Sequence, residues 1–273
     1  MRKSSEIAAK AWLTLLVACT LCVVASKAQT SAQNSGSKAI GKPVIVELFT
    51  SEGCSDCPPA EALALKMENQ VIPGAEVIVL EEHVDYWNRY GWRDPFSSME
   101  WTSRQQDYVS KLGNGNPYTP EMVVDGQSEF VGSDGRAAQQ AIEKAARDAE
   151  TNVTITDASA DPKGAEEAKI SVGKLEGVAA GDVAEVWLAV TEDRLHASVT
   201  AGENAGHTLY HAAVLRSLRK IGVARANGDV AFAGNVQVKF KSGWNRKDVH
   251  VVVFVQDKKS LKILGAAAVK VAS

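Results

Sequence analysis

The sequence predicts two structural parts: an α/β domain over residues 43–150 and a mostly β, sandwich-like domain over residues 151–273. In the first part, buried-strand patterns alternate with helix patterns, which is typical of α/β proteins. In the second part, short segments alternate or run apolar between Gly and Asp turns, as antiparallel strands do. A Cys-x-x-Cys pair, Cys54 and Cys57, directly follows the first predicted strand.

The predicted α/β part has the order strand, helix, strand, helix, strand, strand, helix. Its first strand is an apolar, β-branched run at 43–49, and its first helix begins near Cys57, because Pro58 and Pro59 suit a first helical turn. Two strands joined through a helix predict a parallel, right-handed crossover. The remaining predicted elements are a strand at 76–80, a helix at 96–112, a hairpin of 118–124 and 127–131 around an Asp-Gly turn, and a helix at 136–150.

The second part is predicted to contain one short helix and several strands. Ala212, Leu215 and Leu218 have the spacing of one helix face, which predicts a helix at 211–219. The predicted strands are at 153–155, 168–172, 183–192, 235–240, 249–256 and 262–271.

The N-terminus predicts export. Basic residues precede an apolar run at 11–25 that is short for a membrane span, and small residues follow it, so we interpret residues 1–28 as a signal peptide. Residues 29–42, rich in Ser, Gln, Asn and Gly, then form a flexible lead-in. An alternative cut before Cys19 would leave a lipid-anchored protein. With the first cut, the mature form has no transmembrane anchor and is periplasmic or extracellular.

The charge of the mature chain bears on its partners, and its cysteine content bears on its disulfides. Removing residues 1–28 takes away four of the 30 basic and one of the 33 acidic residues, which leaves 26 basic and 32 acidic residues. This mildly acidic chain lacks the basic stripe that nucleic acid or an anionic membrane requires. Two of the four cysteines, Cys19 and Cys22, are also removed, so the mature protein keeps one Cys-x-x-Cys pair and no disulfide scaffold.

Five motifs together resemble an exported bacterial family catalogued as domain of unknown function 1223. They are Glu-Leu-Phe-Thr-Ser-Glu-Gly-Cys-Ser-Asp-Cys-Pro-Pro-Ala at 47–60, His-Val-Asp-Tyr-Trp at 83–87, Gly-Trp-Arg-Asp-Pro-Phe at 91–96, Tyr-Thr-Pro at 118–120 and Gly-Glu-Asn-Ala-Gly at 202–206. The resemblance covers most of the mature chain and implies a thioredoxin-like fold over residues 43–150. It carries no established reaction.

The cysteine pair predicts thiol chemistry. A thiolate at a helix start is stabilised by the dipole, so Cys54, nearer the turn and more exposed, is the expected attacking thiol and Cys57 the resolving one. The alternative is a small structural disulfide between Cys54 and Cys57. Acidic residues flank the pair without any Lys or Arg, which opposes the thiolate and favours a reducing poise. These acids are Glu47, Glu52, Asp56 and Glu61.

Five further residues are candidate supporting residues. Glu47 lies near the position where thioredoxins keep a buried acid, so it is either a proton acceptor or an ordinary strand carboxylate. His83 and Asp85 follow the second strand, where they either tune thiol protonation or complete a metal site; the alternative for the histidine is a structural hydrogen bond. Thr119 and Pro120 resemble the Thr and cis-Pro that face the dithiol in thioredoxins, where the backbone docks an extended client segment.

The sequence thus predicts an exported thiol–disulfide oxidoreductase that acts on protein or small-thiol clients with an unidentified redox partner and no organic cofactor. One alternative is a copper metallochaperone, because Cys54, Cys57 and His83 form a soft ligand set for Cu(I). Another is a non-enzymatic binding protein with a structural disulfide. The polar segment at 202–206 is interpreted as an ordinary loop in preference to a cover over the dithiol.

Overall fold

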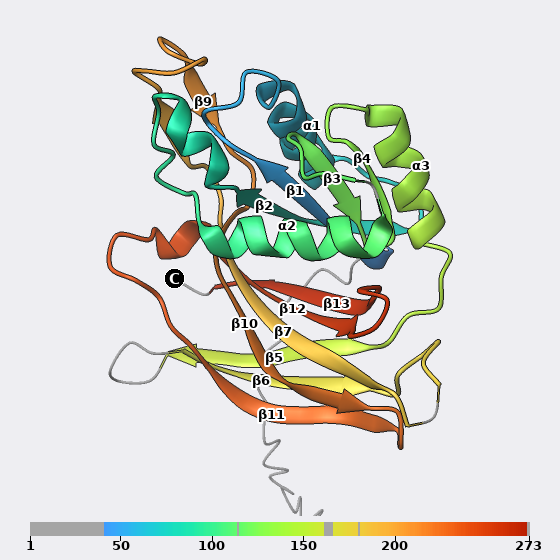
Figure 1. Ribbon diagram of the computed structural model, residues 1–273. Coiled ribbons are helices and arrows are strands. Elements are labelled where there is room, and N and C mark those ends of the chain that lie inside the picture. The colour runs from blue at the N-terminus through green and yellow to red at the C-terminus, as the bar shows by residue number, and fades with distance from the viewer. Residues whose placement is uncertain (1–40, 114, 161–165, 180, 272–273) are drawn as a thin grey trace, which may run out of the picture. The chain divides into compact units, whose positions relative to one another are not determined.

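Strands from both halves of the chain form one mixed sheet of eight strands (Figure 1). The computed structural model describes residues 41–113, 115–160, 166–179 and 181–271, so the predicted signal peptide and Cys19 lie outside the described residues. In chain order the helices and strands are β1 (Lys42–Thr50), α1 (Pro58–Asn69), β2 (Ala75–His83), η1 (Tyr86–Tyr90), α2 (Met99–Leu112), β3 (Glu121–Val124), β4 (Ser128–Val131), α3 (Gly135–Ala145), β5 (Val153–Ala160), β6 (Glu166–Gly173), β7 (Val183–Glu192), β8 (His196–Ser198), β9 (Thr208–Tyr210), β10 (Val214–Arg225), β11 (Val230–Val238), η2 (Arg246–Asp248), β12 (Val249–Asp257) and β13 (Ile263–Lys270).

The predicted fold class is wrong, although most of the predicted elements are present. The eight-stranded sheet has the order β13-β12-β7-β10-β2-β1-β3-β4, so it takes strands from both sides of residue 150. Strands β11, β6 and β5 form a second sheet, and β8 and β9 pair with each other. The described chain is therefore mostly β around one large sheet, and it is not a thioredoxin-like α/β domain followed by a separate sandwich.

The predicted helix at 211–219 explains most of this error, because the chain there forms β10. Leu215 and Leu218 are three residues apart, a helical spacing, yet both pack in the same core cluster. A bulge between Leu215 and Ser217 in the pairing of β10 with β7 inserts one extra residue and turns both leucines to one face of the strand. The bulge thus imitates a helical pattern in the sequence.

Strand β10 is also the element that joins the two halves of the sheet. It pairs antiparallel with β7 along most of its length and meets β2 in parallel at a single register position, Val214 opposite Glu81. The backbone N–H of Glu81 donates to the carbonyl of Ala213 at 2.9 Å. The junction is therefore short, and it places Glu81 beside the segment that leads into β10.

Helices cover both faces of the sheet around β1 and β2. β1 and β2 pair in parallel, as the crossover predicts, and side chains alternate between the faces along each strand. Val46 and Leu48 of β1 share a cluster with buried residues of α1 and α3. On the other face, Phe49 packs with Tyr108 of α2. Residues of one parity therefore face α1, and residues of the other parity face α2.

The second half of the chain adds a sheet-on-sheet contact. Apolar residues of β5 and β6 share one core cluster with those of β7 and β12 from the large sheet. The alternating apolar pattern that predicted a sandwich-like region is thus satisfied by a three-stranded sheet that packs on strands of the large sheet (Figure 1). None of the described residues forms a helix long and apolar enough to cross a membrane.

β13 packs closely against Thr151, which precedes β5, and a substitution can test this contact. Gly265 is buried in β13, where an added Cβ would lie 1.9 Å from the carbonyl oxygen of Thr151. Because backbone must move to admit a methyl group, we expect Gly265→Ala to lower the free energy of unfolding by about 1–3 kcal/mol in urea denaturation. Gly228→Ala is the control, since no atom lies within 4 Å of its added Cβ, and it should stay within about 0.5 kcal/mol. Equal effects of the two substitutions would contradict the packing described.

Candidate functional site

Cys54 and Cys57 form a disulfide, as one of the sequence interpretations requires. A tight turn holds the pair, because the Cys54 N–H donates to the Ser51 carbonyl and the Cys57 N–H to the Cys54 carbonyl. Cys57 directly precedes α1, whose first turn contains two prolines. Both cysteines are buried, with 1% and 0% of their surfaces exposed. In this conformation neither sulfur-bearing side chain is open to a client, and the two cysteines differ little in exposure.

A loop from the second half of the chain covers the disulfide segment. This is the Gly-Glu-Asn-Ala-Gly segment between β8 and β9, and it is held by side-chain hydrogen bonds. Asn204 Nδ2 donates to the carbonyl oxygens of Glu52 and Cys54, each at 2.9 Å. Ser55 donates to Glu203 Oε2 from its backbone N–H at 3.2 Å and from its hydroxyl at 2.7 Å. The covering role, which the sequence did not favour, is the one observed, and we call this segment the covering loop.

Thr119 and Pro120 lie near the start of α1, and the peptide bond between them is cis. Trp87 Nε1 donates to Thr119 Oγ1 at 2.7 Å. An added Cβ on Gly53, the residue before Cys54, would lie 3.3 Å from Trp87 Cβ. The Thr119 side chain is thus connected to the disulfide turn through Trp87.

Asp85 serves the loop after β2. It accepts a hydrogen bond from Thr102 Oγ1 at 2.7 Å, and the same hydroxyl accepts from the Asp85 backbone N–H. These contacts tie the start of η1 to α2. Neither contact involves a cysteine or a histidine.

Glu47 lies on the face of the sheet that α2 covers. Its fully buried carboxylate accepts hydrogen bonds from Arg104 Nε and Tyr108 Oη. Glu82 lies on the same face with Arg104 Nε 3.5 Å from its Oε1, and burial followed by the charge of Glu47 raises the pKa of Glu82 well above its usual range. The partners of Glu47 therefore belong to a polar network around Arg104 rather than to the disulfide.

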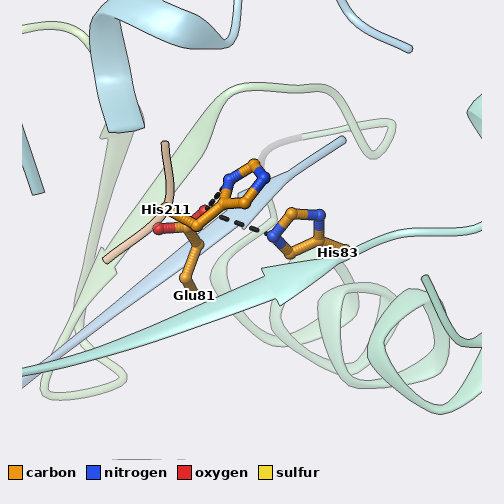
Figure 2. A group of neighbouring side chains, drawn as sticks. All are labelled: Glu81, His83 and His211. Atoms are coloured by element: carbon orange, nitrogen blue, oxygen red, sulfur yellow. Dashed lines mark hydrogen bonds and ion pairs between the residues drawn. The ribbon is translucent and has the colours of Figure 1, made fainter. Parts of the chain in front are cut away.

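A cluster of buried imidazoles and a carboxylate lies on the face that carries α1. Figure 2 shows Glu81 and His83 from β2 together with His211 from the segment before β10. Glu81 Oε1 lies 3.2 Å from His83 Nε2 and 3.0 Å from His211 Nδ1, and all three side chains have 0% exposure. Glu81 Oε2 accepts from the Ala212 N–H at 2.8 Å. We call Glu81, His83 and His211 the imidazole cluster.

Further carboxylates surround the imidazole cluster. Asp94 Oδ2 lies 2.7 Å from His83 Nδ1, and Glu52 Oε1 lies 3.2 Å from His211 Nε2. Glu61 of α1 lies 3.6 Å from His211 Nδ1. Each ring nitrogen of both histidines therefore faces a carboxylate oxygen.

These contacts shift the pKa values strongly. Burial lowers the pKa of His83, but the charge of Asp94 and hydrogen bonds to Asp94 and Glu81 outweigh it and raise the pKa to about 10. For His211, hydrogen bonds to Glu52, Glu61 and Glu81 outweigh burial and raise the pKa to about 12. Burial raises the pKa of Glu81, yet hydrogen bonds from the two imidazoles lower it to about 2. In the absence of another cation, both histidines are imidazolium ions at neutral pH.

Glu61 behaves differently from the other acids of this region. Burial raises its pKa, and a hydrogen bond with His211 offsets only part of that effect. Thr50 Oγ1 donates to Glu61 Oε1 at 2.7 Å. Among these carboxyls, Glu61 is held in a setting that favours its protonated form over that of an ordinary glutamate.

Among the described residues, the imidazole cluster is also the group of side chains that could hold a metal ion. One donor atom from each member lies within 4.8 Å of the others, and neither cysteine belongs to the group. The copper site composed of Cys54, Cys57 and His83 is therefore not formed in this structure. Sequence reasoning named His83 but missed Glu81 and His211. A signal was present, since Glu81, Glu82 and His83 continue a strongly apolar strand pattern without a turn.

The chain matches the model of the family described as "Protein of unknown function (DUF1223)" over residues 45–256. Because the match covers more than half of the chain, the protein belongs to this family, as the five motifs suggested. No curated protein matches the sequence.

Two solved structures resemble this fold. A crystal structure of a protein from Agrobacterium tumefaciens is 26% identical, covers 83% of this chain and 93% of its own length, and has a TM-score of 0.61. HBP35 of Porphyromonas gingivalis is 18% identical, covers 85% of this chain and 76% of its own length, and has a TM-score of 0.60. The similarity to HBP35 concerns the fold alone.

The pKa shifts of the imidazole cluster give stability a defined pH dependence. His83 and His211 have raised pKa values, so their contribution is complete below pH 6.5 and is lost as pH rises toward 10 and beyond. Glu81 has a lowered pKa, so its contribution is complete above pH 4.5 and is lost as pH falls toward 2. Stability from the cluster is therefore greatest between pH 4.5 and 6.5.

We expect the free energy of unfolding, measured in urea with EDTA present, to fall more steeply between pH 6.5 and 10 for the wild-type protein than for His83→Gln. The difference in slope should reach about 1.4 kcal/mol per pH unit at most, the value for one proton. The exposed His196 provides the control substitution, His196→Gln. Parallel pH profiles for wild type and His83→Gln would contradict the assignment.

Proposed function

We propose that the protein is an exported thiol–disulfide oxidoreductase that exchanges disulfides with protein or small-thiol clients through Cys54 and Cys57. The observation that supports it best is the disulfide at the start of α1, where the helix dipole favours a thiolate. A loop closed by so few residues constrains the unfolded chain little, so stability alone is a weak reason for it.

The reaction conserves atoms and electrons. In the reduced protein, the Cys54 thiolate attacks a client disulfide, a mixed disulfide forms, and one client sulfur leaves as a thiolate. The Cys57 thiolate then attacks Cys54 Sγ, which restores the Cys54–Cys57 disulfide and releases the second client thiolate. Two electrons pass to the client, and a thiol reductant must return them before the next cycle.

Glu61 is the best-placed proton acceptor for this cycle, in preference to Glu47. The Glu61 N–H donates to the Cys57 carbonyl at 3.2 Å, the helical i, i+4 bond, so the two side chains lie on one face of the helix. Burial raises the pKa of Glu61 above its ordinary value, which makes it a stronger proton acceptor than an exposed carboxylate. Glu47 is ion-paired with Arg104 beneath α2.

The covering loop must open before a client reaches Cys54. Its bonds to the disulfide turn come from two side chains, Glu203 and Asn204, and Glu203 bonds to the exposed Ser55. The bonds to Ser55 are exposed, whereas the two bonds of Asn204 are buried, so the Asn204 bonds set the larger part of the cost of opening. The backbone at the half-buried Thr119, before the cis-proline, then offers hydrogen-bonding groups to an extended client.

We propose that the Cys54–Cys57 pair reduces client disulfides rather than oxidising client thiols. Glu52 and Glu61 beside the turn oppose a thiolate, while the His211 imidazolium between them offsets part of their charge. The electron donor is an unidentified exported thiol protein or small thiol.

A glutathione redox titration of the metal-free mature protein tests the function directly. We expect a reversible two-electron transition, seen as an alkylation mass shift at Cys54 and Cys57, with a reduction potential nearer to that of thioredoxin than to that of a strong periplasmic oxidase.

The Asn204→Ala variant should reach redox equilibrium several-fold faster than the wild-type protein, because the covering loop opens more often. A disulfide that resists reduction until the protein unfolds would refute the proposal.

Glu61→Gln and Glu47→Gln form a matched pair. Each replaces a buried carboxylate, in α1 and in β1 respectively, by an amide of equal size. We expect Glu61→Gln to slow reduction of a model disulfide by about tenfold to a hundredfold at neutral pH, the lower range for loss of a general base. Glu47→Gln should leave the rate near the wild-type value. The rates of both folded variants are measured by stopped-flow kinetics. Equal slowing of the two variants would contradict the assignment of Glu61 as the proton acceptor.

A second candidate function is a binding protein in which the disulfide only braces a turn. The burial of both cysteines beneath the covering loop favours it. In that case the Cys54→Ser/Cys57→Ser variant keeps partner binding in full, and the redox titration shows no transition below unfolding.

A further inference from the structure

We propose that the imidazole cluster, Glu81, His83 and His211, binds one divalent first-row transition-metal ion of the zinc class. The proposal goes beyond the proposed thiol chemistry and does not depend on it, because neither cysteine contributes a donor atom.

The spacing of the donor atoms suits a single ion. Glu81 Oε1 lies 3.2 Å from His83 Nε2 and 3.0 Å from His211 Nδ1. Ligands of a tetrahedral zinc ion, with bonds of about 2.0–2.1 Å, lie roughly 3.3 Å apart. The two imidazole rings are 4.8 Å apart between centroids and stand at 80° to each other, so both present a nitrogen toward Glu81 without stacking (Figure 2).

The surrounding carboxylates match the outer shell of a metal site. Histidine ligands usually direct the second ring nitrogen to a carboxylate, which orients the ring and raises its basicity. Here His83 Nδ1 faces Asp94 at 2.7 Å, and His211 Nε2 faces Glu52 at 3.2 Å. Both outer carboxylates also accept other hydrogen bonds. The backbone N–H of Glu52 donates to Asp94 Oδ2, and Trp92 Nε1 donates to Glu52 Oε2.

Other groups complete the environment. Glu61 Oε2 lies 3.6 Å from His211 Nδ1 and offers a fourth ligand, the second oxygen of the set. The ring of Phe96 packs edge-on against both imidazoles, with centroids 5.4 Å from His83 and 5.5 Å from His211. The site is therefore walled by an aromatic side chain and fully buried, which strengthens metal–ligand electrostatics.

The charge balance accommodates the ion. Four buried carboxylates, those of Glu52, Glu61, Glu81 and Asp94, surround two imidazoles. One divalent cation brings two positive charges into a site where buried carboxylates outnumber the imidazoles, so the ion offsets buried negative charge. Two nitrogens and one carboxylate oxygen select zinc-class ions over calcium or magnesium, which prefer oxygen ligands throughout.

The test uses full-length mature protein purified without a histidine tag. Metal content is first measured by inductively coupled plasma mass spectrometry, and metal-free protein prepared with a chelator is then titrated with Zn²⁺ by calorimetry and with Co²⁺ by visible absorption. We expect one ion per chain and the intense absorption bands of tetrahedral Co²⁺. The His83→Gln/His211→Gln variant should lose this binding. The Asp94→Asn variant, which keeps all three ligands, should bind about 10–100-fold more weakly.

The controls separate this site from other donors. Cys54→Ser/Cys57→Ser should retain one ion, and so should His250→Gln, which alters a partly exposed histidine paired with Asp193. Far-UV circular dichroism verifies folding, and Asp94→Asn decides the matter if the double histidine variant fails to fold. The proposal is overturned if folded metal-free protein takes up neither ion at one per chain, or if Asp94→Asn and the double histidine variant both bind like wild type.

Discussion

The structure depends on the carboxylate of Glu81, which sits where the two halves of the large sheet meet. Its backbone pairs with Ala213, one carboxylate oxygen accepts from the Ala212 N–H, and the other faces His83 and His211. A buried carboxylate is costly unless it is paired and hydrogen-bonded, so the segment that enters β10 must supply its partners. The Glu81 carboxylate therefore holds the segment that enters β10 and also contacts both histidines of the imidazole cluster.

The disulfide turn and the imidazole cluster share structural elements. Glu52 faces His211 with its side chain, and its carbonyl oxygen accepts from Asn204, which also binds the carbonyl oxygen of Cys54. Glu61 connects the cluster to the helix that begins after Cys57. The covering loop thus contacts backbone of the Glu52–Cys54 segment, which belongs to both places.

Alternation along β2 separates two polar networks that adjacent residues create. Glu81 and His83 face α1, where imidazoles compensate the carboxylate charge. Glu82 faces α2, where Arg104 is already paired with Glu47, and burial raises the pKa of Glu82 well above its usual range. Adjacent glutamates therefore have opposite pKa shifts for one reason: only one of them meets enough positive charge to offset desolvation.

The sequence by itself determined the local elements. Apolar periodicity located β1, α1, β2 and most later strands, and the Cys-x-x-Cys spacing predicted the disulfide, because these signals depend on neighbours within a few residues. Tertiary structure decided the rest: a bulge gave β10 the spacing of a helix, and strand order determined that His211 meets Glu81 across 130 residues. Pairing between distant strands leaves no periodic trace in either strand, so the fold class and the imidazole cluster emerge only when the chain is folded.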